Sequence, residues 1–446
     1  MIHHGYAYIV SLIYIILTTH LQPPLFVLTI KQLGPKRLTM LIGPEAQEVF
    51  CKASDDVLSQ NEVYSFMTAV FGPGVVYDAT KKNRQTQFQT ITSGLRVTTL
   101  KQHVTKIEKE TRQYLKEHFL GNEGTIDLFA ALSELTILTA SRTLHGDDVR
   151  EQLFKEVSKL YHDLDQGLTP LTVFWPHAPT KEHRTRDKAR LEMVQLFSKV
   201  IDARRGNPNH ETDGTDLLGV FMDLKYKDGT SITTEEVTGL LIALLFAGQH
   251  TSCITSTWTS LFIANDPSIM KRINDEQDEI LKRGEDLTYD NLSDMQLLHD
   301  SMREALRLCP PLIMLIRLAM VDVPVKTKEG NTYVIPKGDM VAISPSVGMR
   351  LPDVFPNPDK FDPDRFGDGR EEHKIPYAYM GFGGGMHSCM GQNFAFVQVK
   401  TILSILFREF EIERVAPKMP EIDYEAMVVG PKGDCTVRYK RRSKKA

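Results

Sequence analysis

The segment with the clearest chemical potential is residues 382–391, which read FGGGMHSCMG and precede a predicted helix. Three consecutive glycines permit backbone angles and close approaches that no other residue type allows. Cys389 follows them near the helix N-terminus, where backbone N–H groups and the positive end of the helix dipole favour a thiolate. A thiolate on a rigid loop suits an axial haem ligand, because a strong donor opposite bound oxygen favours O–O cleavage. The loop therefore predicts that Cys389 binds a haem iron.

Two other interpretations of this loop compete with iron binding. A lone cysteine is commonly a small buried hydrophobic residue. A glycine-rich loop can also bind phosphate, but this one has no Gly-Lys-Ser/Thr ending and no predicted strand before it. The full arrangement Phe-Gly-x-Gly-x-x-x-Cys-x-Gly is more specific than either alternative, and it favours haem-thiolate ligation.

The composition is that of an ordinary globular protein large enough to enclose an apolar cavity, with 446 residues, 41% hydrophobic and 25% charged. The net charge of −4 argues against a nucleic-acid partner, which would require a basic face for phosphates. The five cysteines are widely spaced and form no CxxC pair. This spacing does not indicate a disulfide framework or a zinc site, so we expect a reducing, cytosol-facing compartment.

Both ends of the chain carry possible membrane-directed features. Residues 6–17 are nearly all apolar, but the run is shorter than the about 20 residues that span a bilayer. We interpret residues 1–25 as an atypical hydrophobic segment and possible membrane anchor, with a buried element or an atypical leader as alternatives. The basic run at 438–445 is interpreted as a solvated tail, the alternative being attraction to an anionic membrane surface.

The elements that must position the cysteine loop are mostly helical. Alternating apolar and polar residues around Gly34-Pro35 predict a β-hairpin over 26–44. Residues 84–310 show helical periodicity, broken by an exposed loop at 206–215. Within this region the predicted helices include Val104–Phe119, Thr125–Leu144, Glu151–Leu164 and Lys188–Arg205.

Glu235–Ala264 reads as a long apolar helix that crosses the core. Its interior contains Ala247-Gly248-Gln249-His250-Thr251-Ser252, small and polar residues that are unfavourable in a buried helix. On its own this cluster is interpreted as a packing notch. The alternative is that the helix approaches a ligand closely there.

The last third of the chain is predicted to be mixed in structure. A proline-rich connection spans 350–380, a helix covers Gly391–Glu409, and a hairpin closes the chain. The fold class is therefore mainly α with small β-sheets. The predicted short strands before the connection are Val321–Lys326, Thr332–Ile335 and Met340–Ile343.

Taken together, these segments resemble the cytochrome P-450 superfamily. The cysteine loop is similar to the family's haem-binding signature, and Glu304-x-x-Arg307 resembles its Glu-x-x-Arg helix motif. Phe361–Phe366 resembles the meander, whose Arg365 would complete a buried network with the other two side chains. The resemblance implies the cytochrome P-450 fold, with haem between a long central helix and the cysteine loop. It assigns residues 26–446 to an N-terminally shortened monooxygenase domain.

A narrower resemblance, to sterol 14α-demethylases, rests on two segments. Gly248–Ser252 has histidine at position 250, where most cytochromes P-450 have an acid. The match extends from about Phe26 to Arg442 and is similar to the plant-type enzymes that act on obtusifoliol. The second segment is carried by Tyr64, Met67, Phe71, Gly72, Gly74, Val75 and Tyr77.

The resemblance implies a haem b monooxygenase that removes the sterol 14α-methyl group in three oxidations and releases formate. Each round would use dioxygen and two electrons, which NADPH supplies through NADPH–cytochrome P-450 reductase. The implied location is the endoplasmic reticulum membrane, with the catalytic domain facing the cytosol. We expect a monomer that binds a sterol and a membrane surface, and no nucleic acid.

Roles for individual residues follow only from this resemblance. Thr251 would hydrogen-bond the bound oxygen or its water, and His250 would deliver protons with Asp165 as its partner, since histidine shuttles protons near neutral pH.

In the family, phenylalanine at position 66 accompanies sterols with one methyl group at carbon 4, which favours an obtusifoliol-like substrate over lanosterol. The expected donors to the haem propionates are Tyr64, Tyr77, Arg84, Arg317 and His387. The expected substrate contacts are Phe66, Met67, Phe71, Phe246, Ala247, Leu312, Met314, Met427 and Val428.

Two other functions remain alternatives at this stage. A haem-thiolate isomerase or peroxide-rearranging enzyme would need neither reductase nor dioxygen, but Thr251 argues against it. A non-catalytic sterol- or haem-binding protein is the second alternative.

Overall fold

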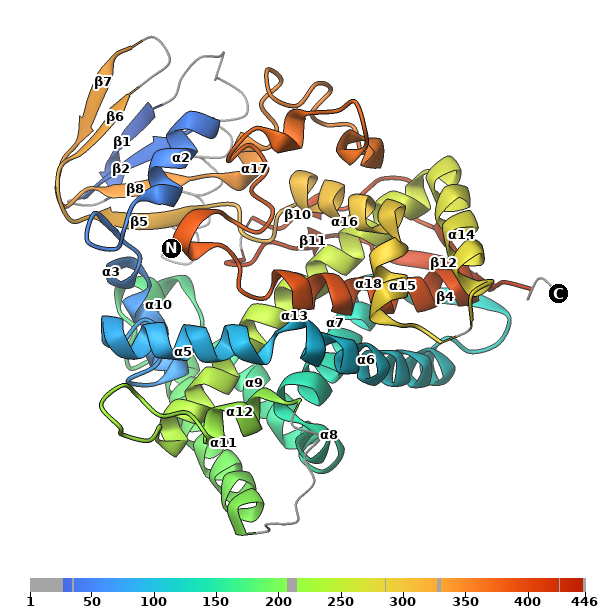
Figure 1. The fold of residues 1–446 in the computed structure, drawn as a ribbon, viewed down its shortest axis with the longest axis horizontal. Coiled ribbons are helices and arrows are strands. Elements are labelled where there is room, and N and C mark those ends of the chain that lie inside the picture. Colours follow the sequence, from blue (N-terminus) through green and yellow to red (C-terminus); the bar gives the residue numbers. More distant parts are fainter. Residues whose placement is uncertain are drawn as a thin grey trace. The chain divides into compact units, whose positions relative to one another are not determined.

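The computed structural model describes residues 27–33, 36–206, 215–284, 286–326, 330–424 and 426–443 (Figure 1). The chain divides into two compact units, each assembled from separate stretches of sequence. Unit 1 contains the described residues of 1–64, 297–389 and 420–433, and unit 2 those of 65–296, 390–419 and 434–446. The predicted anchor at 1–25 lies outside the described residues, as does most of the predicted loop at 206–215.

Unit 1 is built on a five-stranded sheet of order β1-β2-β8-β5-β3. Strands β1 and β2 pair antiparallel, whereas β2 pairs parallel with β8, Leu38 opposite Met340. Its strands are β1 (Val27–Leu33), β2 (Lys36–Leu41), β3 (Leu58–Ser59), β5 (Leu315–Ala319), β6 (Val323–Lys326), β7 (Thr332–Ile335), β8 (Met340–Ile343), β10 (Glu421–Ile422) and β11 (Pro431–Lys432). Its helices are α2 (Pro44–Lys52), α3 (Asn61–Tyr64), α16 (Gln296–Leu308), α17 (Pro345–Gly348) and the 3-10 turns η3 (Pro363–Phe366), η4 (Glu372–Lys374) and η5 (Gly385–His387).

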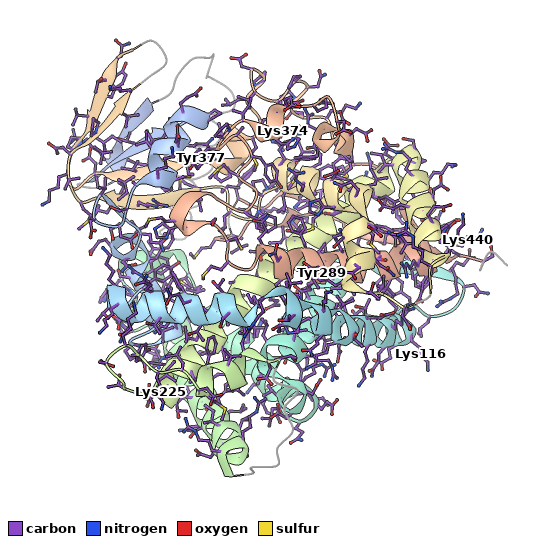
Figure 2. All side chains as sticks on the ribbon, viewed as in Figure 1. Lys116, Lys225, Tyr289, Lys374, Tyr377 and Lys440 are labelled. Carbon is purple, nitrogen blue, oxygen red and sulfur yellow. The ribbon has the colours of Figure 1, made fainter. Side chains whose placement is uncertain are left out.

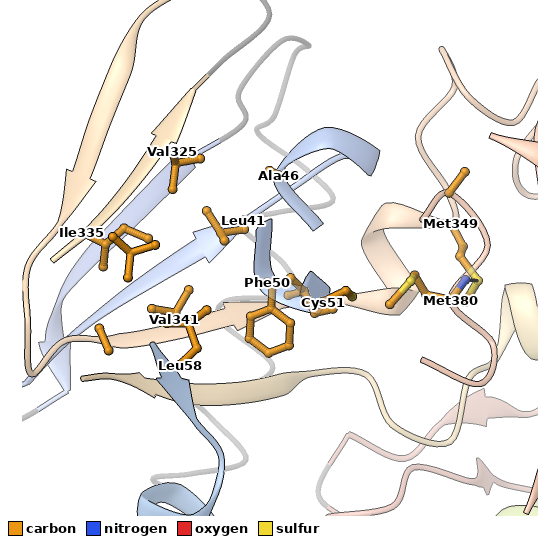
Figure 3. Packing of buried hydrophobic residues seen from close by; sticks show 14 of the residues in the cluster. Leu41, Ala46, Phe50, Cys51, Leu58, Val325, Ile335, Val341, Met349 and Met380 are labelled. Atoms are coloured by element: carbon orange, nitrogen blue, oxygen red, sulfur yellow. Dashed lines mark hydrogen bonds between the residues drawn. The ribbon is translucent and has the colours of Figure 1, made fainter. Parts of the chain in front are cut away.

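The core of unit 1 lies between this sheet and α2. Leu41, Phe50, Leu58 and Val341 are fully or almost fully buried and pack in one cluster with Cys51 (Figure 3). Removing such side chains from water contributes about 1.5–3 kcal/mol each. This packing fixes α2 on the sheet, and the cysteine loop rests against α2.

Unit 2 is mostly helical, with one three-stranded antiparallel sheet of order β4-β12-β9. On α6 the buried positions alternate with exposed ones, and the labelled Lys116 points outward (Figure 2). Its strands are β4 (Glu123–Asp127), β9 (Phe410–Arg414) and β12 (Thr436–Arg441). Its helices are η1 (Ser65–Met67), α4 (Thr68–Phe71), α5 (Lys81–Gly94), α6 (Val97–His118), α7 (Leu128–Ala140), the π-helix η2 (Ser141–His145), α8 (Asp147–Gln152), α9 (Phe154–Gln166), α10 (Pro170–Phe174), α11 (Lys181–Gly206), α12 (Leu217–Met222), α13 (Thr234–Asn265), α14 (Pro267–Leu281), α15 (Tyr289–Asp294) and α18 (Gln392–Glu409).

Helix α13 is the 32-residue central helix of unit 2, packed against α7, α11 and α18. It begins with a capping box, in which Thr233 Oγ1 accepts from Glu236 N at 3.2 Å and Glu236 Oε2 accepts from Thr233 N at 2.9 Å. Within the part of the chain that the structure describes, it is the one helix long and apolar enough to cross a membrane. Because most of it is buried among other helices, we interpret it as a core helix.

The predicted hairpin at 26–44, the long helix at 235–264 and the helix at 391–409 are confirmed as β1–β2, α13 and α18. The helix predicted from Thr125 is wrong in its first turn, because Glu123–Asp127 pairs with β12 instead. Strand β5 was not predicted. The helix predicted over Glu151–Leu164 is interrupted at Leu153, which separates α8 from α9.

Candidate functional site

The cysteine loop in unit 1 has a conformation that depends on its glycines. Gly383 and Gly385 adopt φ angles of 70° and 67°, in the left-handed region that other residues rarely occupy. A Cβ atom on Gly385 would lie 2.0 Å from the carbonyl oxygen of Cys51 on α2. The loop closes when the N–H of Cys389 donates to the carbonyl of Phe382 at 2.9 Å. Glycine is therefore required for the loop to lie this close to α2.

Cys389 differs from the other four cysteines in being exposed. Burial raises the pKa of the Cys51 thiol to about 11 and that of Cys253, Cys309 and Cys435 to about 12, which disfavours their thiolates. Only Cys389 combines an accessible sulfur with the strained glycine loop.

The surroundings of Cys389 fit a flat apolar group such as haem. Met386 and Met390, which flank Cys389 in the sequence, are 64% and 40% exposed among the residues that the structure describes. Exposed apolar surface of this kind is typical of a binding face. An accessible thiol on this face matches the axial ligand that a haem-thiolate protein requires.

The predicted network of Glu304, Arg307 and Arg365 is assembled in the interior of unit 1. Both oxygens of Glu304 accept from Arg307, Oε2 from Nε at 2.8 Å and Oε1 from Nη2 at 2.9 Å. Arg365 Nε donates to Glu304 Oε1 at 3.2 Å. All three side chains are at most 1% exposed. A buried carboxylate is tolerated here because two guanidinium groups surround it.

The two arginines also hold the irregular segment that follows β8 and α17. Arg307 Nη1 donates to the Met349 carbonyl at 2.9 Å, and Arg365 Nη1 donates to the Pro356 carbonyl at 2.9 Å. The network thereby fixes α16 to the proline-rich connection that leads to the cysteine loop.

In unit 2, helix α13 carries an uncovered face in the middle of its buried length. Leu245 and Gln249 are buried, whereas Ala247 is exposed. A Cβ atom on Gly248 would meet no described atom within 4 Å. Thr251 Oγ1 donates to the Ala247 carbonyl at 2.6 Å on the same face. The packing-notch interpretation is therefore wrong for Gly248, since no described neighbour fills the space beside it.

A close packing contact of α13 lies nine residues, about two and a half turns, before Gly248. A Cβ atom on Gly239 would lie 2.1 Å from the Phe71 carbonyl oxygen, so α4 crosses α13 at this glycine. The crossing places the Phe71 ring 6.2 Å from the Phe246 ring, edge-on. Two of the predicted substrate contacts are thus brought together next to the uncovered face.

His250 and Asp165 are also brought together, from α13 and α9. His250 Nε2 lies 3.2 Å from Asp165 Oδ1, and both side chains are about one-third exposed, at 30% and 34%. The pair links α13 to α9 and is partly open to solvent.

The sequence pattern did not indicate Tyr161, which lies one helical turn before Asp165 on α9. Its ring centroid lies 4.5 Å from that of Phe246 and 6.1 Å from that of His250. Burial and the neighbouring charge of Asp165 raise its pKa well above the usual value. The spacing of four between Tyr161 and Asp165 was the available signal, because such residues share a helix face.

The expected propionate donors in unit 1 have protein partners. His387 Nε2 lies 2.9 Å from Asp55 Oδ1, and the Tyr64 hydroxyl accepts from the N–H of Ile316 at 3.4 Å. Arg317 is buried, donates to the Phe50 carbonyl at 2.6 Å and lies over the Phe50 ring at 4.3 Å. Burial lowers the pKa of Arg317.

The other predicted residues fall into two groups, one in each unit. In unit 2, Phe66 and Phe71 are buried and Met67 is half-buried. In unit 1 the N–H of Val429 donates to the Pro311 carbonyl at 2.9 Å, which brings two chain segments together. These segments carry the predicted contacts Leu312, Met314, Met427 and Val428, all half-buried or exposed.

Comparison with known proteins identifies the family. The family model named Cytochrome P450 matches residues 27–436. The chain is 48% identical to a sterol 14-demethylase of Arabidopsis thaliana over 410 residues, covering 91% of this chain and 83% of the relative. It is also 48% identical to an obtusifoliol 14-alpha demethylase of Sorghum bicolor, covering 91% and 82%. The chain belongs to the sterol 14-demethylase family of cytochromes P450.

The fold is likewise that of a cytochrome P450. A retinoic-acid-bound cyanobacterial cytochrome P450, CYP120A1, superposes with a TM-score of 0.82 at 22% sequence identity. The match covers 94% of this chain and 92% of that structure. The predicted family and fold are therefore confirmed.

Proposed function

We propose that this cytochrome P450 is a sterol 14α-demethylase that acts on obtusifoliol-like sterols. The observation that carries the proposal is Cys389, an exposed thiol on a glycine loop that only glycine can form, in a chain nearly half identical to plant 14-demethylases. The reaction converts the 14α-methyl group to an alcohol, then to an aldehyde, and finally releases it as formate.

Haem b, when bound, supplies the oxidising chemistry, with dioxygen and with electrons from NADPH through a reductase. Cys389 would hold the iron as a thiolate. Tyr64, Tyr77, Arg84, Arg317 and His387 are proposed to fix the propionates, since cationic and hydroxyl donors suit carboxylates.

Proton delivery is assigned to residues of α13 and α9. The Thr251 hydroxyl, which donates to the Ala247 carbonyl, could rotate to donate its hydrogen to dioxygen or to a water molecule in the site. His250 passes protons inward, and Asp165 orients its ring through the 3.2 Å contact. The partial exposure of this pair supports an exchange of protons with solvent.

A sterol offers one hydroxyl group and a large hydrocarbon surface, so its binding face should be apolar. Phe71 and Phe246 lie edge to face beside the exposed Ala247. Within unit 2, Phe66 and Met67 are further proposed contacts for the sterol. Within unit 1, the proposed contacts are Leu312, Met314, Met427 and Val428.

We further propose a monomer on the cytosolic side of the endoplasmic reticulum membrane, with NADPH–cytochrome P-450 reductase as its electron donor. The apolar character of the sterol substrate supports a membrane location. The reductase would supply both electrons of each round.

A reconstituted assay with purified protein tests the proposed function. The reduced protein should give a thiolate-type carbon monoxide difference spectrum, and obtusifoliol should displace the iron-bound water. With reductase, NADPH and dioxygen, formate should accumulate. Turnover without NADPH or reductase would indicate a haem-thiolate isomerase instead, and sterol binding without any turnover would indicate a binding protein.

Phe66→Leu is expected to shift substrate preference from obtusifoliol towards lanosterol. Phe66 is buried, and a smaller side chain makes room for the second methyl group at carbon 4. One methyl group in an apolar site changes specificity about 10- to 200-fold. Competition between the two sterols gives the ratio of their kcat/KM values. An unchanged ratio, or a wild-type enzyme that prefers lanosterol, contradicts this assignment.

Asp165→Asn is expected to lower turnover on the order of 10²-fold while sterol binding is retained, because His250 loses its charged partner. Single-turnover rates in H₂O and D₂O, together with the spectral titration of obtusifoliol, measure the two effects. Asp163→Asn makes the same charge change on the same helix and should leave turnover unchanged. If the two variants lowered turnover equally, the loss of turnover would come from the change in the charge of α9 and not from the loss of the His250–Asp165 pair.

A further inference from the structure

The segment that carries Tyr77 contains a strained turn. Val76 adopts a φ angle of 47°, an unusual conformation for a β-branched residue. Gly72 and Gly74, just before it, have φ angles of 92° and 72°. Strain of this kind persists only when neighbouring groups hold it in place.

Gln87 on α5 is the side chain that holds this turn. It is fully buried, at 0% exposure. Its Oε1 accepts from the N–H of Val76 at 3.0 Å, and its Nε2 donates to the carbonyl of Gly74 at 2.8 Å. One amide thus bonds the backbone on both sides of the turn, two residues apart. Loss of this amide would leave two half-buried backbone groups without these hydrogen bonds.

A second link connects the same amide to the start of α13. Gln87 Nε2 also donates to the Tyr226 hydroxyl at 3.1 Å, which in turn donates to Glu236 Oε1 at 2.8 Å. Glu236 is the capping-box partner of Thr233 at the start of α13, and a Cβ atom on Gly74 would lie 3.0 Å from its Oε1. The turn and the N-terminus of α13 are therefore held by one hydrogen-bonded chain.

Tyr77 and Arg84, two of the expected donors to the haem propionates, both lie between Val76 and Gln87 in the sequence. Arg84 is buried and precedes Gln87 by three residues, so both side chains lie on one face of α5. Burial raises the pKa of Tyr77, and the nearby positive charge of Arg84 opposes that rise. The ring of Tyr77 stacks on that of Phe71, with the ring centroids 6.4 Å apart.

We infer that Gln87 is a positioning residue for haem binding. It holds the Val76 turn in the strained conformation that directs Tyr77 towards the propionate that Arg84 also binds. Gln87 itself does not contact the haem, and its effect passes through the backbone of residues 74–77. This inference rests on the proposed haem binding.

The test compares Gln87→Met with Gln277→Met in the purified holoenzyme. Methionine keeps the approximate volume of glutamine but removes its hydrogen bonds. Gln277 is a matched control because it is also 0% exposed in unit 2 and accepts hydrogen bonds, from Ser404 and Arg408 on α18. The readouts are the rate of haem transfer to apomyoglobin and the propionate bending modes in the resonance Raman spectrum.

Gln87→Met is expected to transfer haem about tenfold faster than the wild type and to shift a propionate mode, whereas Gln277→Met should do neither. Gln87→Glu keeps the acceptor for Val76 but loses the donor to Gly74, so it should fall between the two. Equal haem transfer from Gln87→Met and Gln277→Met overturns the inference. If the wild type binds no haem, the proposed function itself fails, and that result is distinguishable at once.

Discussion

Cys389→Ser is expected to abolish the thiolate-type carbon monoxide difference spectrum and all sterol turnover while the protein remains folded. Cys389 is exposed, so the exchange of sulfur for oxygen removes no core packing. A serine hydroxyl is not ionised near neutral pH and does not replace a thiolate as an iron ligand. Circular dichroism measures whether the variant is folded, and the haem content measures whether it retains haem. The difference spectrum measures whether a thiolate binds the iron.

The control for this variant is Cys309→Ala, which changes a buried cysteine. It should lower the melting temperature because it removes a packed side chain, yet leave the difference spectrum intact. A normal spectrum from Cys389→Ser would contradict the assignment of the iron ligand. Loss of the spectrum in Cys309→Ala without unfolding would do the same.

Glu304→Gln is expected to destabilise the protein by about 3–5 kcal/mol, because two buried guanidinium groups lose their shared carboxylate. Much of the protein should then be recovered without haem, since the same network fixes the connection that leads to the cysteine loop. Urea unfolding and the ratio of haem to protein measure the two consequences.

Glu151→Gln makes the same substitution at an ion pair that water reaches. Glu151 Oε1 lies 3.1 Å from Arg142 Nη1, and its side chain is 57% exposed. Exposed pairs contribute only about 0–1 kcal/mol, so this variant should be close to the wild type. Similar losses in the two variants would mean that burial of the Glu304 network does not govern its contribution.

Elements whose stability is local could be predicted from the sequence. Helix α13 has its own capping box and a continuous apolar sequence, and α18 follows a clear glycine signal. Strand β4 could not be predicted, because Thr125 is a strand residue only through its partner Arg438, far along the chain. Strand β5 likewise depends on its pairing with β8, which is distant in the sequence. It also follows two prolines, which obscure the alternation of apolar and polar residues that would indicate a strand.

The candidate site also contains residues that the local sequence predicts and residues that depend on distant contacts. Cys389 is identifiable because a triple glycine is rare and has a direct conformational meaning. The contact between His250 and Asp165 needed the family resemblance, since 85 residues separate them. Gln87 and Tyr226 carry no local signal at all, because a buried glutamine is defined by the backbone groups of a turn elsewhere in the chain.

The parallel pairing of β2 with β8 has a consequence for synthesis on the ribosome. Leu38 can pair with Met340 only after the ribosome has added about 300 further residues. Their synthesis takes roughly 15–60 s at typical elongation rates. During that time the apolar edge of the nascent hairpin lacks its partner and is open to chaperones or to other chains. Gly385 emerges later still, so its contact with Cys51 can form only after every strand of the five-stranded sheet has been synthesised. Cofactor insertion is thereby a late event in the maturation of this chain.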